Sequence, residues 1–597
     1  MIEETVRQIQ ALANDGRLFD AIDRARAVAA DEDRAPALER LRIEEVTLLS
    51  RVSSFGEAQE AFDAYNLGAS TDLQARALGA RLKKDAGLAA GDDALLHESR
   101  NAYLAVADAP GDGADMRRRR EHAGVNAVTL SRLIGDMAPV EDLAAALMRA
   151  PPGDSYWSWA TRAELLAATG AVGDDVRAAL AEAIRHDGGG LSDRAVTLRQ
   201  LRLLGCPEDA LSPLRPGAVL HYTGHMIAAP GATGRVLAAS EPELTRRIHE
   251  ALRRIDPAMV YGSFASGADI IIAEWARADG RAIRLFAPFA LEPFLDSSVR
   301  PAGGDWEARA RALIADGPPV TYGSKNAPIA GDDNVFATCA RLAMGAAILR
   351  ATRVDATTRQ LLVWDGEPAR GPAGAAADGA IWRATGRPQD IVDVSDLGAP
   401  PPVPAPRAPT PDREASAIVF GDVKAFSKLT EQLLPAFVDH VLGGIRASLD
   451  VATARYGPDA LRFSNTWGDA IFAVFDSAAA AAVFAMDLQV RLAALHETAP
   501  ELPKDLSIRL GMHFGVVHRR RDPVTGEMNR FGEAVARAAR IEPITTEGRI
   551  FVTEDFAAEL ALDAEAPVKM EYVGRKDAAK DYGEFRLFRI RPKDDPA

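Results

Sequence analysis

The sequence predicts a multidomain protein in which an α-helical region is followed by an α/β domain and then by an α+β domain. Helix-type spacing of apolar residues extends to about residue 215, and short apolar runs then alternate with helical segments to about residue 396. A proline-rich stretch separates these parts from a last third with strands, a hairpin and a long helical run. We therefore expect domains at 1–215, 216–396 and 415–597, with a linker at 397–414.

Composition and charge argue against several classes of protein. The 597 residues include 47% apolar and 26% charged side chains, and the net charge of −15 disfavours nucleic-acid binding. The two cysteines, Cys206 and Cys339, allow neither a disulfide framework nor a cysteine metal site. The chain start lacks the features of a signal peptide, and no apolar run approaches the ~18 residues of a membrane helix. We expect a cytoplasmic protein that binds neither membrane nor nucleic acid.

Residues 1–215 are expected to form paired helices joined by short turns. Small alanines follow Phe19 and Phe55, where the two helices of a hairpin must approach closely. This region resembles degenerate tetratricopeptide-type repeats, which implies a partner protein on a concave face. The alternative is a helical domain that only packs against its neighbours. The basic run Arg117–Arg120 is expected on a solvated helix face. The helix breaks are Asn14–Gly16, Gly111–Gly113, Pro151–Gly153 and Gly188–Gly190.

Residues 216–396 alternate between strand and helix patterns, which predicts a parallel sheet covered on both faces. Ligands of such sheets bind beyond the carboxyl ends of the strands, where this chain carries glycines. A helix beginning near Ala268 could present N–H groups to a phosphate. The expected strands are 218–222, 258–261, 283–287, 320–322 and 361–364, and the expected helices begin near Glu241, Ala268, Gly304 and Asp333.

The segment Gly262–Asp269, with Glu274 after it, resembles the SLOG superfamily of Rossmann-like nucleotide-binding and sensor domains. The resemblance implies an unknown small nucleotide-like effector. The Pro-Gly-Gly-x-Gly-Thr-x-x-Glu loop of relatives with phosphoribohydrolase activity is absent from the sequence, which favours sensing over catalysis. Alternatively, these glycines and serines are ordinary turn residues and Glu274 lies on a helix surface. The candidate ligand residues are Gly224, His225, Ser263, Ser266, Gly267, Asp269 and Glu274.

Two aspartates in the last third close apolar strand patterns. Asp422 ends the run that begins at Ala417, and Asp469 lies at the tip of a hairpin. Aspartates at the ends of neighbouring strands can hold two divalent cations, as attack on a phosphorus atom requires. The alternative is that each is a turn or capping residue. A helical run from Leu429 to Tyr456 follows, and its start would offer backbone N–H groups to a triphosphate near Phe426 and Ser427.

These aspartates, together with the phrases Gly511–Gly515 and Gly532–Glu542, resemble the catalytic domain of class III nucleotide cyclases. The resemblance implies a ferredoxin-like layout with helices on one side of one sheet. It also implies conversion of ATP or GTP to a cyclic nucleotide by a homodimer that uses two divalent cations, Mg²⁺ or Mn²⁺. Asp422 and Asp469 match the metal ligands, and Arg540 matches the transition-state arginine. Ion pairing of Arg540 with Glu533 or Glu542 is the alternative. Candidates for gripping the distal phosphates are Arg575, Lys576 and Lys580.

Three positions depart from the family pattern. Asn465 and Asn529 stand at the base-recognition positions, and an amide can read either purine. Ala536 stands where an asparagine normally orients the ribose, and losing one such donor costs about 10²–10³ in rate. The sequence therefore favours a ligand-regulated purine nucleotide cyclase, with ATP as the first expected substrate. A catalytically silent, nucleotide-responsive scaffold is the rival hypothesis.

Overall fold

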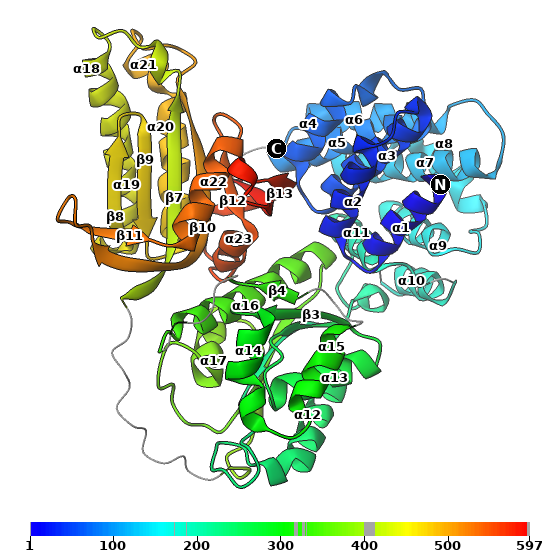
Figure 1. The fold of residues 1–597 in the computed structure, drawn as a ribbon. Coiled ribbons are helices and arrows are strands. Elements are labelled where there is room, and N and C mark those ends of the chain that lie inside the picture. Colours follow the sequence, from blue (N-terminus) through cyan, green and yellow to red (C-terminus); the bar gives the residue numbers. More distant parts are fainter. Residues whose placement is uncertain are drawn as a thin grey trace.

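The computed structural model describes residues 2–171, 173–186, 188–315, 320–324, 329, 331–398 and 412–593. Figure 1 shows a helical region, an α/β domain and an α+β domain packed against one another. The predicted order of fold classes is confirmed. Most of the predicted proline-rich linker, residues 399–411, lies outside the described residues.

The helical region consists of short helices that pack in succession, as the breaks in the sequence predict. Neighbours along the chain such as α5 and α6, α6 and α7, and α9 and α10 contact one another. Ala21, Ala25 and Ala58 are fully buried, as close approach of paired helices requires. The helices are α1 (Ile2–Asn14), α2 (Leu18–Ala30), α3 (Ala35–Arg51), α4 (Phe55–Ala64), α5 (Leu73–Ala90), α6 (Asp93–Ala107), α7 (Ala114–Ile134), α8 (Glu141–Arg149), α9 (Tyr156–Ala168), α10 (Asp174–His186) and α11 (Leu191–Leu203).

The α/β domain has a six-stranded, all-parallel sheet in the order β4-β3-β2-β1-β5-β6. Leu220 and its neighbours pack with α12 and α13, whereas Val219 points to the opposite face and packs with α16. All five predicted strands are present, and β6 was not predicted. The elements are β1 (Val219–Gly224), α12 (Glu241–Ile255), β2 (Met259–Gly262), α13 (Ala268–Ala278), β3 (Ala282–Ala287), α14 (Leu291–Ser298), α15 (Trp306–Ala315), β4 (Val320–Tyr322), α16 (Asn334–Val354), β5 (Thr358–Trp364), α17 (Ala375–Ala384) and β6 (Gln389–Asp393).

Helix α16 lies at the centre of the molecule and corrects one expectation from the sequence. By length and composition it is apolar enough to cross a membrane, although no such run was expected. Most of that stretch is buried, because α16 packs against its own sheet and against helix α23 of the last domain. A Cβ on Gly345 would come within 1.9 Å of the Ala558 carbonyl oxygen, so the two backbones touch at this glycine. The apolar composition of α16 is therefore that of a helix buried between the α/β domain and the last domain.

The last domain has a mixed sheet in the order β13-β14-β12-β10-β7-β9-β8, with β11 paired to β10. Val419 and Phe475 face the core that contains α19 and α20, whereas Ile418 and Val474 pack with Ala538 of α22. The expectation of helices on one side only was therefore wrong, because both faces of these strands are apolar. The elements are β7 (Arg413–Lys424), α18 (Leu434–Ala436), α19 (Gly443–Tyr456), β8 (Leu461–Trp467), β9 (Ala470–Phe475), α20 (Ala478–Ala493), α21 (Leu495–Thr498), β10 (Ser507–Arg521), β11 (Met528–Phe531), α22 (Glu533–Ile541), β12 (Ile550–Thr553), α23 (Glu554–Ala561), β13 (Val568–Asp577) and β14 (Glu584–Pro592).

The first helices of the chain pack on the last two strands. Phe19 of α2 stacks on Tyr572 of β13, with ring centroids 4.1 Å apart. The hydroxyl of Tyr572 donates to Asp23, and its backbone N–H donates to the Ser54 hydroxyl at 2.6 Å. Figure 1 shows this contact where the red strands meet the blue helices. The opposite side of the sheet, with β8 and β9, points away from the helical region.

Candidate functional site

The register of β7 against β9 brings the two predicted metal aspartates together. Asp422 pairs with Ala470, the residue after Asp469, and the Val423 N–H donates to the Asp469 carbonyl oxygen at 3.1 Å. Burial raises the pKa of the Asp469 carboxyl, and the nearby Asp422 charge raises it further. The two carboxylates therefore repel each other across the hairpin tip, and a cation between them would relieve that repulsion.

Sequence reasoning missed a third carboxylate and an arginine at this place. Arg509 lies directly opposite Asp422 in the β10–β7 register, and its Nη2 donates to Asp422 Oδ2 at 2.7 Å. The same nitrogen lies 3.0 Å from Glu542 Oε1. Burial raises the pKa of Glu542, Arg509 opposes this shift, and the charges of Asp422 and Asp469 reinforce it. Only the strand register, which the sequence does not state, identifies Arg509.

The paired aspartates fit a site for hard divalent cations. Their oxygens are the donors that Mg²⁺ and Mn²⁺ prefer, and their mutual repulsion favours a bound cation. No cluster of three or more potential ligands among His, Cys, Asp and Glu occurs in the described part of the chain. A metal held by Asp422 and Asp469 would therefore have to complete its coordination with other oxygens, such as those of a bound triphosphate.

Helix α22 carries the predicted transition-state arginine in its last turn. Glu533 pairs with Arg537 at 2.7 Å, and Glu542 pairs with Arg509. Within the described residues neither carboxylate forms an ion pair with Arg540, and the Arg540 Nε is buried without a hydrogen-bond partner. Ala536, one turn earlier, has no side-chain donor to offer. Arg540 therefore takes part in none of the ion pairs among the described residues.

The two predicted base-recognition amides lie on different strands. Asn465 is exposed on the edge strand β8, and its side-chain oxygen accepts from Thr466 N at 2.9 Å. Asn529 lies on β11 and donates to Asp522 Oδ2 at 3.3 Å. Because β10, β7 and β9 separate β11 from β8, the two amides do not meet within one chain. Large apolar side chains are exposed on the same two elements, with Trp467 at 56% and Phe531 at 40%.

The residues predicted to bind the triphosphate, Phe426 and Ser427, do not lie at the start of a long helix. Phe426 and Ser427 belong to a 3₁₀ turn, and regular helix begins only at Leu434, because Ala425 adopts a left-handed conformation and a turn follows. A π-helix at Phe437–Leu442 then precedes α19. The expected helical run therefore begins at Leu434 instead of Leu429 and contains a π-helical segment, and it ends at Tyr456 as predicted. The 3₁₀ turn still lies beside the hairpin tip, since a Cβ on Gly468 would be 4.0 Å from the Phe426 ring.

The three basic candidates for the distal phosphates lie at the far edge of the sheet. Arg575 is ion-paired with Asp23 of the helical region and with Glu584, each at 3.0 Å. Lys576 is exposed at the end of β13, and Lys580 is exposed in the β13–β14 connection. Four strand spacings separate β13 from β7, or about 19 Å, so the candidates in β13 lie far from Asp422 of the same chain.

A second candidate site is a cavity of about 360 Å³ at the carboxyl ends of β1 and β2. Four of the candidate ligand residues, Gly224, His225, Ser263 and Asp269, line it. Three other predicted residues lie outside its lining. Ser266 donates to the Ser298 carbonyl oxygen at 3.2 Å, Gly267 is the N-cap of α13, and Glu274 pairs with Arg309 at 2.7 Å. Glu274 thus matches the surface-helix alternative.

Carboxylates dominate this cavity. Burial raises the pKa of both Asp269 and Asp378 to about 7, and each has an oxygen without a hydrogen-bond partner among the described residues. Thr223 donates to the other Asp378 oxygen at 2.8 Å. His225 Nε2 lies 3.0 Å from Asp365. Asp378 was missed because it lies far along the sequence from the glycine motif. Such a lining suits hydroxyl, amino or cationic groups better than the phosphate expected at the α13 start.

The helical region contains a cavity of about 410 Å³. Tyr103, His122 and Trp157 line it together with Arg118 and Arg119, two members of the basic run expected on a solvated face. Arg119 also pairs with Asp72 at 3.1 Å. The run is therefore only partly solvated, because two of its members border this cavity.

Comparison with known proteins finds a family match for the last domain. Residues 409–582 match the family model described as adenylate and guanylate cyclase catalytic domain. The adenylate cyclases of Neurospora crassa and Lachancea kluyveri are 30% and 29% identical over 113 and 164 residues, which are 16% and 24% of this chain. The chain spans only 5% and 8% of the length of these relatives.

Solved structures give matches of similar extent. An adenylate/guanylate cyclase/hydrolase from Silicibacter pomeroyi is 25% identical, with a TM-score of 0.24, and the match covers 30% of this chain and 98% of that one. The adenylyl cyclase CyaB from P. aeruginosa is 16% identical, with a TM-score of 0.26, and the match covers 30% and 94%.

Proposed function

We propose, from the premise that residues 409–582 form an adenylate/guanylate cyclase catalytic domain, that the protein converts a purine nucleoside triphosphate to its 3′,5′-cyclic nucleotide and pyrophosphate. The observation that carries the proposal is the β7–β9 register, which puts Asp422 and Asp469 side by side. ATP is the first candidate substrate, since the curated relatives named above are adenylate cyclases.

The reaction joins the ribose 3′-oxygen, which releases its proton to the solvent, to the α-phosphorus and breaks the bond from that phosphorus to the departing pyrophosphate. Asp422 and Asp469 would hold divalent cations, which would supply activation of the hydroxyl and neutralisation of the phosphates. Arg540 would stabilise the charge that develops on the α-phosphate. Arg509, which donates to Asp422, would contact the phosphate chain of the substrate. Asn465 and Asn529 would contact the base without a fixed charge preference.

The direct test is product formation. Purified full-length protein is incubated with ATP or GTP and with Mn²⁺ or Mg²⁺, and cyclic nucleotide is quantified. Asp469→Ala should lose nearly all activity, whereas Asp450→Ala is the matched control, because Asp450 is an exposed carboxylate of the same domain that pairs with Arg446. Equal activity in wild type and Asp469→Ala would show that the predicted site is not the catalytic one.

We propose further that the working unit is a two-fold dimer in which the aspartates of one protomer face Arg540 of the other. Trp467 of β8 and Phe531 of β11 are exposed, and Figure 1 shows both strands on the side away from the helical region, which supports this arrangement. Asp469→Ala and Arg540→Ala homodimers should each be nearly inactive. A mixed dimer keeps one intact site, so random mixing should restore about a quarter of wild-type activity. Doubly tagged mixed dimers that stay inactive would contradict the shared site.

The cavity of the α/β domain is proposed as the sensor site for a nucleotide-like effector. Its unpartnered Asp269 and Asp378 oxygens would accept hydrogen bonds from ribose hydroxyls or a base amino group. Calorimetry of the full chain against a nucleotide panel tests this proposal, with Asp378→Asn as the site variant and Asp396→Asn, an exposed residue paired with Arg247, as the control. Absence of binding, or equal binding by all three proteins, would refute the assignment.

One observation favours the rival function, a catalytically silent nucleotide-responsive scaffold. Ala536 supplies no donor on the turn before Arg540, so one transition-state contact has no counterpart on α22. A scaffold would bind ATP with Mn²⁺ and form no cyclic product. Binding measured by calorimetry beside the product assay separates the two functions.

A further inference from the structure

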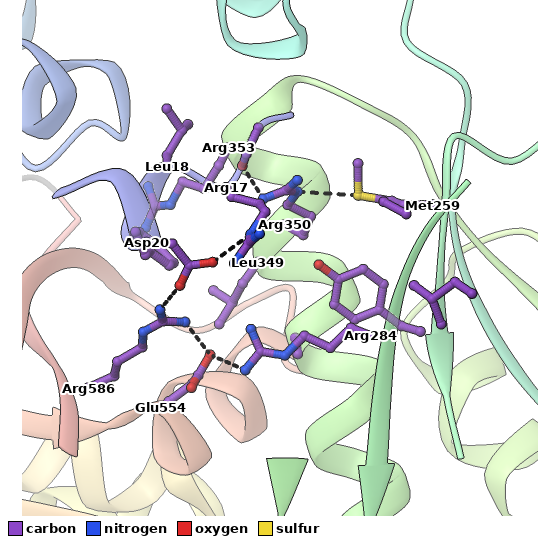
Figure 2. Close-up of a pocket in the computed structure, with 16 residues that line it drawn as sticks. Arg17, Leu18, Asp20, Met259, Arg284, Leu349, Arg350, Arg353, Glu554 and Arg586 are labelled. Atoms are coloured by element: carbon purple, nitrogen blue, oxygen red, sulfur yellow. Dashed lines mark hydrogen bonds and ion pairs between the residues drawn. The ribbon is translucent and has the colours of Figure 1, made fainter. Parts of the chain in front are cut away.

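A small cavity lies where the three parts of the protein meet. It has a volume of about 110 Å³ and receives residues from every part: the turn between α1 and α2, strands β2 and β3 with helix α16, and the start of α23 with strand β14. Figure 2 shows these side chains converging from the three differently coloured ribbons. This cavity is separate from the paired aspartates and from the carboxylate-lined cavity of the α/β domain.

The lining of this three-domain cavity carries a surplus of positive charge. Two carboxylates, Asp20 and Glu554, face five arginines, which are Arg17, Arg284, Arg350, Arg353 and Arg586. Asp20 is shared by Arg17 and Arg586. Glu554 is shared by Arg284 at 3.3 Å and Arg586 at 3.9 Å. Asp23, just outside the lining, adds a contact to Arg586 at 3.4 Å. Figure 2 shows this alternating chain of charges.

Arg350 and Arg353 have no carboxylate within ion-pair distance among the described residues. Arg350 donates to the carbonyl oxygens of Asp15 and Gly16, and its Nε lies 3.2 Å from the Met259 sulfur. Arg353 donates to the carbonyl oxygens of Val52 and Met570. Burial lowers the pKa of both, that of Arg353 to about 10. Carbonyl dipoles satisfy some of the N–H groups but leave the charges of buried Arg353 and of partly buried Arg350 unbalanced, which is costly.

Three of the five arginines also have unused donors. The Nε atoms of Arg284, Arg353 and Arg586 are buried, and none has a hydrogen-bond partner in the part of the chain that the structure describes. Arg353 and Arg586 are each only 9% exposed as whole residues. Buried donors on cations are rarely left unsatisfied in folded proteins. An acceptor with negative charge in the cavity would satisfy these donors and balance the surplus of positive charge.

We propose that the three-domain cavity binds a small multivalent oxyanion of the phosphate class. Guanidinium groups match the geometry of phosphate oxygens and form charge-assisted hydrogen bonds with them. The small volume, about 110 Å³, suits one phosphoryl group better than a whole nucleotide. The source is either free inorganic phosphate or the phosphoryl group of a small metabolite. Contacts to arginines of all three parts would make the anion a link between them.

The test uses the full-length protein at constant ionic strength with a chelator present, so that metal-dependent binding of phosphate at the paired aspartates is suppressed. Phosphate affinity is measured by calorimetry and by the rise in melting temperature. The site variant is Arg284→Gln. The matched control is Arg281→Gln, because Arg281 precedes the same strand, has a similar exposure of 29% against 25%, and pairs with Asp256 and Asp279 outside the cavity.

We expect saturable phosphate binding in wild type and in Arg281→Gln, and affinity reduced about 10-fold or more in Arg284→Gln, as loss of a charge-assisted hydrogen bond predicts. Arg17→Gln, at the exposed rim, should also weaken phosphate binding. It replaces Arg284→Gln as the site variant if Arg284→Gln does not fold. An equal effect of chloride at the same ionic strength, or unchanged affinity in the folded site variants, would overturn the proposal.

Two ligands distinguish the source of the phosphoryl group. Inorganic phosphate and glycerol 3-phosphate are compared in wild type and in the folded site variant. Tighter binding of free phosphate supports an ion site, and tighter binding of the ester supports a metabolite whose remainder projects from the cavity. Failure of both ligands to bind wild type would refute the proposal, and this outcome does not depend on whether the protein forms cyclic nucleotides.

Discussion

Replacing Arg509 by methionine removes the guanidinium that joins Asp422 to Glu542 and keeps a similar side-chain volume. At 2.7 Å the bare attraction between Arg509 and Asp422 would be about 6 kcal/mol with an effective dielectric of about 20. The two side chains are 28% and 35% exposed, so solvent screening reduces the net value to about 1 kcal/mol. The contact to Glu542 at 3.0 Å adds a comparable amount.

A cation that binds Asp422 must displace this internal cation. Removing Arg509 should therefore tighten Mn²⁺ binding by about 1–2 kcal/mol, or about 5- to 30-fold. The same variant should lower kcat, since Arg509 is proposed to contact the phosphates, by about 10²–10³. Opposite changes in metal affinity and turnover distinguish this reasoning from simple damage to the fold, which would weaken both.

The assay combines calorimetric Mn²⁺ titration of the metal-free protein with cyclic-nucleotide formation at saturating Mn²⁺. Arg446→Met is the matched control, because Arg446 pairs with Asp450 on an exposed helix face of the same domain. Arg509→Lys should retain part of the wild-type behaviour because it keeps the charge. Unchanged or weaker Mn²⁺ binding by Arg509→Met would refute competition between the arginine and the metal.

Three further predictions follow from other places in the structure. Asn465→Lys combined with Asn529→Asp should raise the preference for ATP over GTP, measured as the ratio of kcat/KM values, and an unchanged ratio would show that these amides do not face the base. The pKa of Asp378 is about 7 when folded against 3.8 ordinarily, so the folded protein binds the extra proton and its stability falls by up to about 4 kcal/mol as pH rises from 4 to 7. Asp378→Asn should accordingly raise the melting temperature at pH 8 and change it little at pH 4, and equal shifts at both would contradict a raised pKa. Asp23→Asn removes the carboxylate that accepts from Tyr572 and should loosen the helical region, by about 1–3 kcal/mol, seen as faster limited proteolysis with the catalytic domain still folded.

The sequence predicted those elements whose apolar pattern is self-contained. Strands such as β1 and β5 are apolar runs that end at turn residues, whereas β6 has the sequence Gln389–Asp393 with three polar residues, because it lies at the sheet edge. The π-helix at Phe437–Leu442 was missed because its local sequence does not differ in pattern from an α-helix. Local patterns therefore identify elements, and they fail at edges and at irregular turns.

Predicting the candidate site was limited by information that only register and packing supply. Asp422 and Asp469 were found because both belong to recognisable phrases. Arg509 belongs to none and becomes visible only when β10 is aligned with β7. Asp378 lies on α17, and only the packing of that helix beside β1 brings it to the Gly224 end of the strand. Glu274 was assigned to the ligand through the resemblance to SLOG domains, but its partner is Arg309 on another helix.

The stacking of Phe19 on Tyr572 means that the beginning and the end of the chain hold each other without passing through the middle domain. Each part of the protein thus contacts both of the others, rather than only its neighbour along the chain. A protein made as two separate polypeptides, 2–398 and 412–593, should therefore reassemble, because both the Tyr572 contact and the α16–α23 contact would draw the pieces together. A catalytic domain excised alone would expose the apolar surface that these contacts cover. Its stability and activity would therefore differ from those of the same domain in the full chain.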